Sequence, residues 1–268
     1  MTSAALGEQP DLTVVLREAR RRRRISQWDL SLELGVSQRH VSFVELGRAR
    51  PSRELLLRWM SALGAPLSLS NQALVSAGHA PAYDESPLDS HRLDQERAAL
   101  RDLLVAHEPC PALLLDRGWN VVAANAGVAW LFDAVGVEVE LPGPDPAAPG
   151  SSGVNLLDLA LGELGAAVLN VPEVAASLLE QLRDEAVTEP SLRERVEQVA
   201  VVAASAAHAP SGPRYPPALV TRYATRHGEL AFLSMFTTFG TPHSVTLASL
   251  RVELFLPADD ATWAALGR

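Results

Sequence analysis

The chain has 268 residues, 47% of them apolar and 21% charged, so it is long enough for two domains and too apolar to remain a disordered polymer. Cys110 is its only cysteine, which excludes a disulfide within the chain and a zinc site built from several thiolates. No basic segment followed by an apolar one begins the chain, and no later apolar stretch reaches the about 20 residues of a membrane span. We expect a cytoplasmic protein without membrane contact or cofactor.

The net charge of −9 is unevenly distributed along the chain. Residues 1–65 contain 11 Arg and 7 acidic residues, a net charge of +4, and the remainder therefore carries −13. A basic N-terminal part in an acidic chain is compatible with a separate domain that binds nucleic acid.

Residues 1–80 show the pattern of a compact all-α domain with about five short helices. The first carries an apolar stripe from Leu12 to Ala19 and a basic end, Arg20 to Arg24. Ser26 is an N-cap for a second helix that Gly35 ends, and Ser37 is an N-cap for a third helix. Two further helices follow, one up to Gly64 and one at about 67–77.

The third helix has one face that the core does not use. Val41 and Val44 point toward the core, and each residue of a helix turns by about 100°. The opposite face then carries Arg39, Ser42 and Phe43, with Gln38 at its N-terminal edge.

The segment Ser26–Gly47, with Gln27, Gly35, Val36, Ser37, Gln38 and Val41 in these positions, resembles the helix-turn-helix of the XRE, or Cro/C1-like, repressor family. The resemblance extends from Leu12 to Leu63 and implies that the third helix enters the major groove of double-stranded DNA. Arg can fork onto guanine, Gln can pair with adenine, and Ser suits either donors or acceptors. The base-reading candidates are Gln38, Arg39 and Ser42.

Other residues of the same segment are candidates for contacts that position the protein on DNA. Members of this family usually contact DNA phosphates at helix N-termini, where free backbone N–H groups also donate hydrogen bonds. In this sequence those positions are Gln27, Arg50 and Ser52. Further candidate DNA contacts are Ser37, His40 and Phe43.

The sequence predicts a linker at residues 81–90 and a second, α+β domain at residues 91–268. A helix is expected at 91–107, a β-hairpin at 112–115 and 119–124, a short helix from Asn125, and helices at about 173–187 and 190–206. Loops rich in Pro are expected at 142–153 and 210–217. Three strands are expected at about 218–226, 229–239 and 244–255, the last from the alternation of apolar residues with Ser249, Arg251 and Glu253.

The order of these elements, with the segments Leu113–Asp116 and Gly118–Asn125 and the closing stretch from Phe239 to Pro257, resembles the MmyB-like ligand-binding domain. This resemblance covers about 91–256. It implies a PAS-like fold, in which helices and an antiparallel sheet enclose an apolar cavity that accommodates a fatty-acid-like molecule.

Candidate ligand contacts follow from what such a cavity needs. Aromatic side chains available for its walls are Trp119, Trp130, Phe232, Phe236 and Phe239. Side chains that could hold a polar head are Asn125, Arg222 and His243. Each has a structural alternative, since an aromatic residue on a strand can be ordinary core and Asn125 can cap a helix.

The leading hypothesis is a DNA-binding transcription regulator, a homodimer whose C-terminal domain responds to a small apolar ligand. Three alternatives remain: a ligand-independent repressor or antitoxin-like regulator, a helical protein-interaction module, and an enzyme. The sequence contains no Gly-x-Ser-x-Gly elbow, phosphate loop or paired-His metal motif, so we expect no enzymatic activity.

Overall fold

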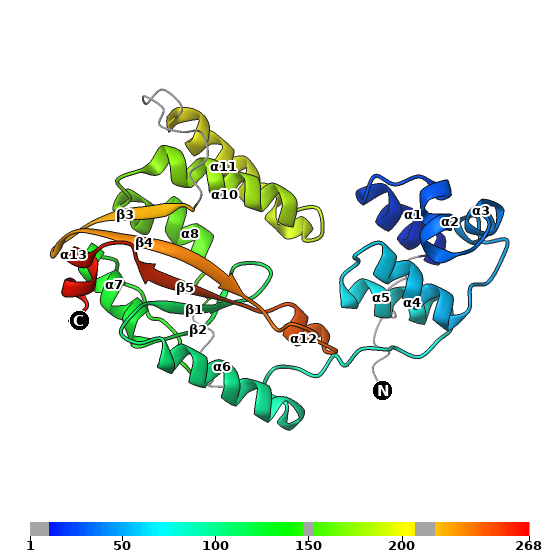
Figure 1. Cartoon of the computed structure of the whole chain (residues 1–268), viewed down its shortest axis with the longest axis horizontal. Coiled ribbons are helices and arrows are strands. Elements are labelled where there is room, and N and C mark those ends of the chain that lie inside the picture. The colour runs from blue at the N-terminus through cyan, green and yellow to red at the C-terminus, as the bar shows by residue number, and fades with distance from the viewer. Residues whose placement is uncertain (1–10, 147–152, 207–217, 268) are drawn as a thin grey trace, which may run out of the picture. The chain divides into compact units, whose positions relative to one another are not determined.

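The computed structural model describes residues 11–146, 153–206 and 218–267, which form two compact units (Figure 1). Unit 1 consists of Met1–Glu85 and Thr241–Ala248, and unit 2 consists of Ser86–Gly240 and Ser249–Arg268. The first change of unit falls within the expected linker at 81–90. The expected loops at 142–153 and 210–217 lie in large part outside the described residues.

Unit 1 is helical, which confirms the expected all-α domain. Its elements are α1 (Leu12–Arg22), α2 (Gln27–Leu34), α3 (Gln38–Glu45), α4 (Arg53–Ala62), α5 (Leu67–Ser76) and α12 (Val245–Ala248). The side chains of Asp11, Ser26, Ser37 and Ser52 each accept a hydrogen bond from the first turn of a helix. Gly35 ends α2 with a φ of 64°, a left-handed conformation that favours glycine. Local capping thus sets the short helix lengths.

The core of unit 1 is built from the apolar stripes of its helices. The fully buried side chains include Leu16, Leu30, Leu34, Val41, Leu56, Trp59, Met60 and Leu74. Each of the helices α1 to α5 contributes at least one of them. The exposed face of α3 is held in place by this packing.

Asn71 on α5 fixes the chain that follows the five helices. Its amide oxygen accepts hydrogen bonds from the backbone N–H groups of Ala82 and Tyr83 at 2.9 and 3.0 Å. Its amide nitrogen donates to the Tyr83 carbonyl at 2.8 Å and to Glu85 at 2.7 Å. The first half of the expected linker is therefore ordered as part of unit 1.

The segment Thr241–Ala248 joins unit 1 through the backbone of Asp84. The Asp84 N–H donates to the His243 carbonyl at 3.1 Å, and the Val245 N–H donates to the Asp84 carbonyl at 2.8 Å. The expected strand at 244–255 is therefore corrected. Residues 245–248 form α12, with Ser244 at its start, and the strand begins only at Arg251.

Unit 2 contains a five-stranded antiparallel sheet in the order β2-β1-β5-β4-β3, as expected for the second domain. The strands are β1 (Ala112–Leu115), β2 (Val121–Ala124), β3 (Val220–Thr225), β4 (Gly228–Thr237) and β5 (Arg251–Pro257). The register pairs Leu113 with Glu253 and Ser234 with Phe255. The last strand of the sequence therefore lies at the centre of the sheet.

Helices lie on both sides of this sheet. They are α6 (Asp94–Ala106), α7 (Ala126–Val135), α8 (Leu156–Leu161), α9 (Glu163–Ala166), α10 (Val171–Glu185), α11 (Arg193–Ala206) and α13 (Asp260–Ala265), with 3-10 turns η1 (His91–Leu93) and η2 (Pro190–Leu192). Figure 1 shows α8, α10 and α11 on one side of the sheet and α6 on the other. No helix in the described ranges has the length and apolar character that crossing a membrane would require.

Asn71→Ala should loosen the chain after α5. The substitution leaves two backbone N–H groups and one carbonyl without their partner, at a cost of about 1 to 3 kcal/mol in the free energy of unfolding. Hydrogen exchange at Ala82 and Tyr83 should accelerate, and the melting temperature should fall.

Gln72→Ala is the matched control, because Gln72 is the exposed neighbour of Asn71 on the same helix. Equal exchange rates at Ala82 and Tyr83 in the two variants would show that Asn71 does not anchor this segment.

Candidate functional site

The N-terminal part of α3 presents polar side chains to solvent. Ser37 caps this helix by accepting a hydrogen bond from the His40 N–H at 3.2 Å. Gln38 and Arg39 are exposed, and the guanidinium carbon of Arg39 lies 5.0 Å from the centre of the Phe43 ring. His40, Ser42 and Phe43 are half-buried at the edge of this surface.

A buried carboxylate holds α3 against its neighbours, a feature that the sequence analysis missed. Glu45 is 2% exposed, and Arg20 of α1 donates to both of its carboxylate oxygens at 2.7 and 2.9 Å. Arg17 donates to its backbone carbonyl at 2.8 Å. Burial acts to raise the pKa of Glu45, but hydrogen bonds from Arg20 and Gln27 and the charge of Arg20 outweigh burial and lower it.

The expected phosphate-gripping residues lie at helix N-termini. Gln27 begins α2, and its amide donates to Glu45 at 2.8 Å, so this side chain is already engaged within unit 1. Ser52 is exposed and caps α4 through a 3.2 Å bond from the Leu55 N–H. Arg50 is exposed just before it.

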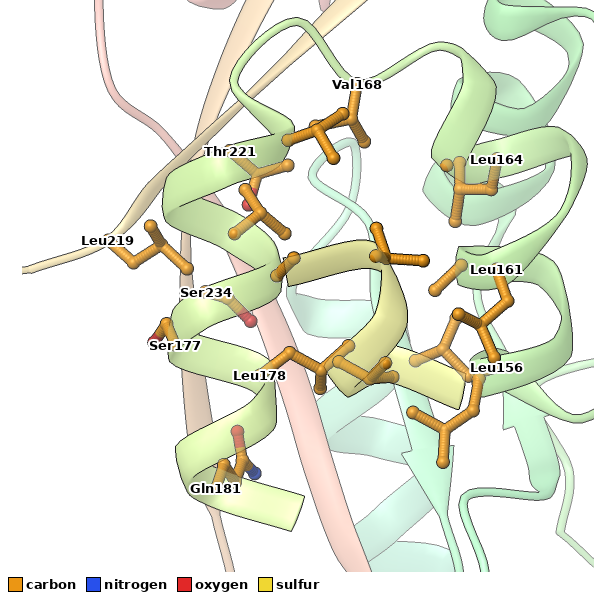
Figure 2. A pocket seen from close by; sticks show the side chains of 18 of the residues that line it. Leu156, Leu161, Leu164, Val168, Ser177, Leu178, Gln181, Leu219, Thr221 and Ser234 are labelled. Atoms are coloured by element: carbon orange, nitrogen blue, oxygen red, sulfur yellow. The ribbon is translucent and has the colours of Figure 1, made fainter. Parts of the chain in front are cut away.

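Unit 2 contains an apolar cavity of about 580 Å³ between its sheet and its helices. Leu156 and Leu161 of α8 and Leu164 of α9 form part of the wall, and α10 contributes a stripe that includes Leu178 (Figure 2). Alternate residues of β3, β4 and β5 line it from the sheet. A cavity of this size and character suits a small, mostly apolar molecule.

Six polar side chains lie among the described residues that line the cavity. Ser177 and Gln181 come from α10, and Thr221 and Ser234 come from β3 and β4, as Figure 2 shows. Two more come from the sheet, Tyr223 and Glu253. Of the six, only Glu253 carries a carboxyl group, and none carries a basic one.

Comparison with known families gives two matches. Residues 97–268 match the model of the MmyB-like transcription regulator ligand binding domain, and residues 16–69 match a helix-turn-helix model. The chain belongs to the MmyB-like transcription regulators. None of the curated proteins compared with the chain matches it.

This MmyB-like regulator is thus a DNA-binding transcription regulator that carries a ligand-binding domain. The helix-turn-helix match begins within α1, covers α2 to α4 and ends in the first turn of α5, and the ligand-binding match covers the sheet and the cavity. Both resemblances seen in the sequence are confirmed.

Of the expected aromatic wall residues, Trp119 and Phe236 line the cavity. Their ring centres lie 6.0 Å apart at an interplanar angle of 77°. Trp119 has a φ of 66°, so its backbone is in the left-handed region and β2 begins two residues later than expected. The Trp119 backbone N–H donates to the Asp116 carbonyl at 3.1 Å, and its side-chain Nε1 donates to Glu185 at 2.8 Å.

The other three expected aromatic residues lie elsewhere in the MmyB-like regulator. Trp130 stacks on His227 with ring centres 5.5 Å apart. Phe232 is fully buried and its ring contacts those of Tyr223 and Phe255, which line the cavity, but Phe232 is not itself among the lining residues. Phe239 follows β4 and is half-buried outside the cavity.

The expected polar head contacts also lie away from the cavity. Asn125 is 2% exposed and caps α7, and its amide group bonds to the backbone of residues 104, 110, 112 and 128. Arg222 is exposed and pairs with Glu229 at 2.6 Å, because it points to the opposite face of β3 from Thr221 and Tyr223. His243 is an exposed residue of unit 1.

The polar residues of β5 were missed as site residues. Their alternation with apolar residues is typical of a strand with one wet face, but Glu253 is 7% exposed, and the Arg251 side chain is 15% exposed. Arg251 donates to Glu185 at 2.5 Å and lies over the rings of Trp119 and Phe236, 4.3 and 4.9 Å from their centres. No local signal marks this burial, because helices distant in sequence cover the strand.

Burial raises the pKa of Glu253 from 4.5 to about 7, although a hydrogen bond from Ser234 and the charge of Arg251 act in the opposite direction. In the folded regulator the carboxyl group therefore keeps its proton at a pH where the unfolded chain has lost it. Its contribution to stability is complete below about pH 4.5 and is lost as the pH rises through about 7.

Glu253→Gln should therefore become more stabilising as the pH rises. Between about pH 5 and about pH 8 the free energy of unfolding of the variant, relative to the native chain, should gain about 1 to 3 kcal/mol. Urea denaturation followed by circular dichroism measures this difference.

Glu197→Gln makes the same chemical change at an exposed position of α11 and should show no such trend. If the Glu253→Gln difference were also constant with pH, Glu253 would titrate normally in the folded protein.

Proposed function

We propose that this chain is a ligand-controlled DNA-binding regulator, in which a small, mostly apolar molecule in the unit 2 cavity changes the affinity of unit 1 for its operator. The observation that carries the proposal is the apolar cavity of about 580 Å³ in a chain that also carries a helix-turn-helix. The expected fatty-acid-like shape agrees with the aliphatic walls.

The proposed DNA-reading surface is the exposed N-terminal part of α3. Gln38 and Arg39 present hydrogen-bonding groups to solvent, and Ser42 lies on the same helix between Arg39 and the buried Glu45. Ser37, His40 and Phe43 flank them. Arg50, Ser52 and the start of α2 at Gln27 are proposed to position the helix by phosphate contacts.

The chain path supports coupling between cavity and DNA. Strands β4 and β5 both line the cavity, and the segment that connects them, Thr241–Ala248, belongs to unit 1. A ligand that binds one arrangement of these strands more tightly can therefore favour one conformation of this unit 1 segment, because the segment is covalently continuous with both strands.

We also propose that the regulator acts as a homodimer on double-stranded DNA, because one short reading helix spans few base pairs and a two-fold dimer reads two half-sites. The alternative is a ligand-independent repressor, or an antitoxin-like regulator, whose second domain dimerises or binds a protein. A ligand-dependent change in operator affinity separates the two.

Arg39→Ala should weaken binding to an operator selected from random DNA by the native protein. The loss of a bidentate contact to one guanine is worth about 1 to 3 kcal/mol, and discrimination at that base pair should relax. Fluorescence anisotropy with the selected duplex and with single-base variants measures both.

Arg39→Lys is the matched control, since it keeps the charge but lacks the planar fork. It should retain binding to unrelated DNA and lose discrimination at the same base pair. Unchanged operator affinity in Arg39→Ala would remove Arg39 from the reading surface.

Ala160→Phe should fill part of the cavity, because Ala160 lines it from α8. Native protein, extracted with organic solvent, should yield an apolar compound at near one per chain by mass spectrometry, and the variant should yield much less. Adding the extracted compound should change operator affinity in the native protein only.

Ala129→Phe adds the same ring at an exposed position of α7 and should leave loading and response intact. If the native extract were empty and both variants bound the operator with equal affinity, the ligand-independent regulator would be favoured.

A further inference from the structure

Glu253 has an unused hydrogen-bonding position in the cavity. One carboxylate oxygen, Oε1, accepts a hydrogen bond from the Ser234 hydroxyl. The other oxygen, Oε2, is buried and has no hydrogen-bond partner among the described residues. A buried acceptor without a partner destabilises a folded protein, so a ligand group that donates to Oε2 would recover a large part of this cost.

The surroundings of Glu253 also define which ligands the cavity disfavours. The described residues that line the cavity include no Arg, Lys or His. The cation on the same strand, Arg251, is not among them. It donates from Nη1 to Glu185 and lies over the Trp119 and Phe236 rings, and its buried Nε and Nη2 have no hydrogen-bond partner among the described residues. An anionic head group in this cavity would meet a carboxyl group and no lining countercharge.

We propose that Glu253 is a specificity-determining residue for the ligand, and that the ligand is an apolar chain ending in a hydrogen-bond donor, a hydroxyl or amine group, that binds Glu253 Oε2. This inference rests on the proposed ligand-sensing function and deepens it. It narrows the fatty-acid-like expectation. The ligand keeps the apolar hydrocarbon chain of a fatty acid but ends in a hydrogen-bond donor instead of an ionised carboxylate.

The protonation state of Glu253 agrees with this assignment. Burial raises its pKa to about 7, so both forms exist near neutral pH. A hydroxyl group can donate to either form, a protonated amine pairs with the ionised form, and an ionised carboxylate is repelled by that form.

The test compares three probes of one chain length, decan-1-ol, decylamine and decanoate, by isothermal titration calorimetry with the delipidated full chain. The titrations use concentrations below micelle formation and about pH 8, where the amine and the fatty acid are both charged. Decan-1-ol or decylamine should bind at least about tenfold more tightly than decanoate, the effect expected from one hydrogen bond to a charged group. The alcohol and amine arms distinguish the two donors.

Glu253→Gln should reverse the preference, because its amide N–H can donate to a carboxylate. The ratio of donor-probe affinity to decanoate affinity should fall at least about tenfold. Glu197→Gln, exposed on α11, should keep the native ratio. Circular dichroism verifies that both variants fold. The comparison of the three probes in the native protein tests the proposal without any variant.

Decanoate binding as tightly as the donor probes in the native chain would overturn the role of Glu253 while leaving the ligand-sensing proposal intact. An unchanged ratio in Glu253→Gln would do the same. If no probe bound, the specificity proposal and the apolar-ligand part of the proposed function would both fail.

Discussion

The central position of β5 is the constraint on which unit 2 depends. This strand pairs with β1 on one edge and β4 on the other, and both Val252 and Glu253 are buried although they point to opposite faces. Any polar group on β5 is therefore withdrawn from water and must find a partner. Arg251 finds Glu185 and two aromatic rings but leaves Nε and Nη2 without a hydrogen bond among the described residues, and Glu253 satisfies only one of its oxygens. A strand that builds the core thereby also contributes a carboxyl group to the cavity wall.

Unit 1 also contains a buried carboxylate, Glu45, but this one is paired with an arginine. The Arg20–Glu45 pair joins α1 to the last residue of α3, and Arg17 and Gln27 add bonds from α1 and α2. A buried ion pair adds little net stability compared with apolar packing, but breaking it leaves an uncompensated charge. This network therefore fixes the orientation of α3 through directional bonds and leaves Gln38 and Arg39, at the N-terminal end of the helix, exposed.

The chain path links the two roles of the regulator. The connection from β4 to β5 leaves unit 2, forms α12, and returns, so two strands of the cavity wall are continuous with a segment of unit 1. Backbone bonds to Asp84 tie that segment to the chain that follows α5. Ligand binding that shifts these strands has a covalent route to unit 1 that does not depend on side-chain contacts.

The sequence alone determined the features that local chemistry encodes. Capping residues such as Ser26 and Ser37 set the helix limits, and the helix-turn-helix and the MmyB-like order of elements followed from residues close together in the chain. Tertiary structure alone decided which side chains face the cavity. Trp119 and Arg251 each lie 66 residues from Glu185, the residue they share, and the burial of Glu253 arises from helices packed over its strand. Local periodicity carries no record of such distant partners, because it reports the faces of an element and not what covers them.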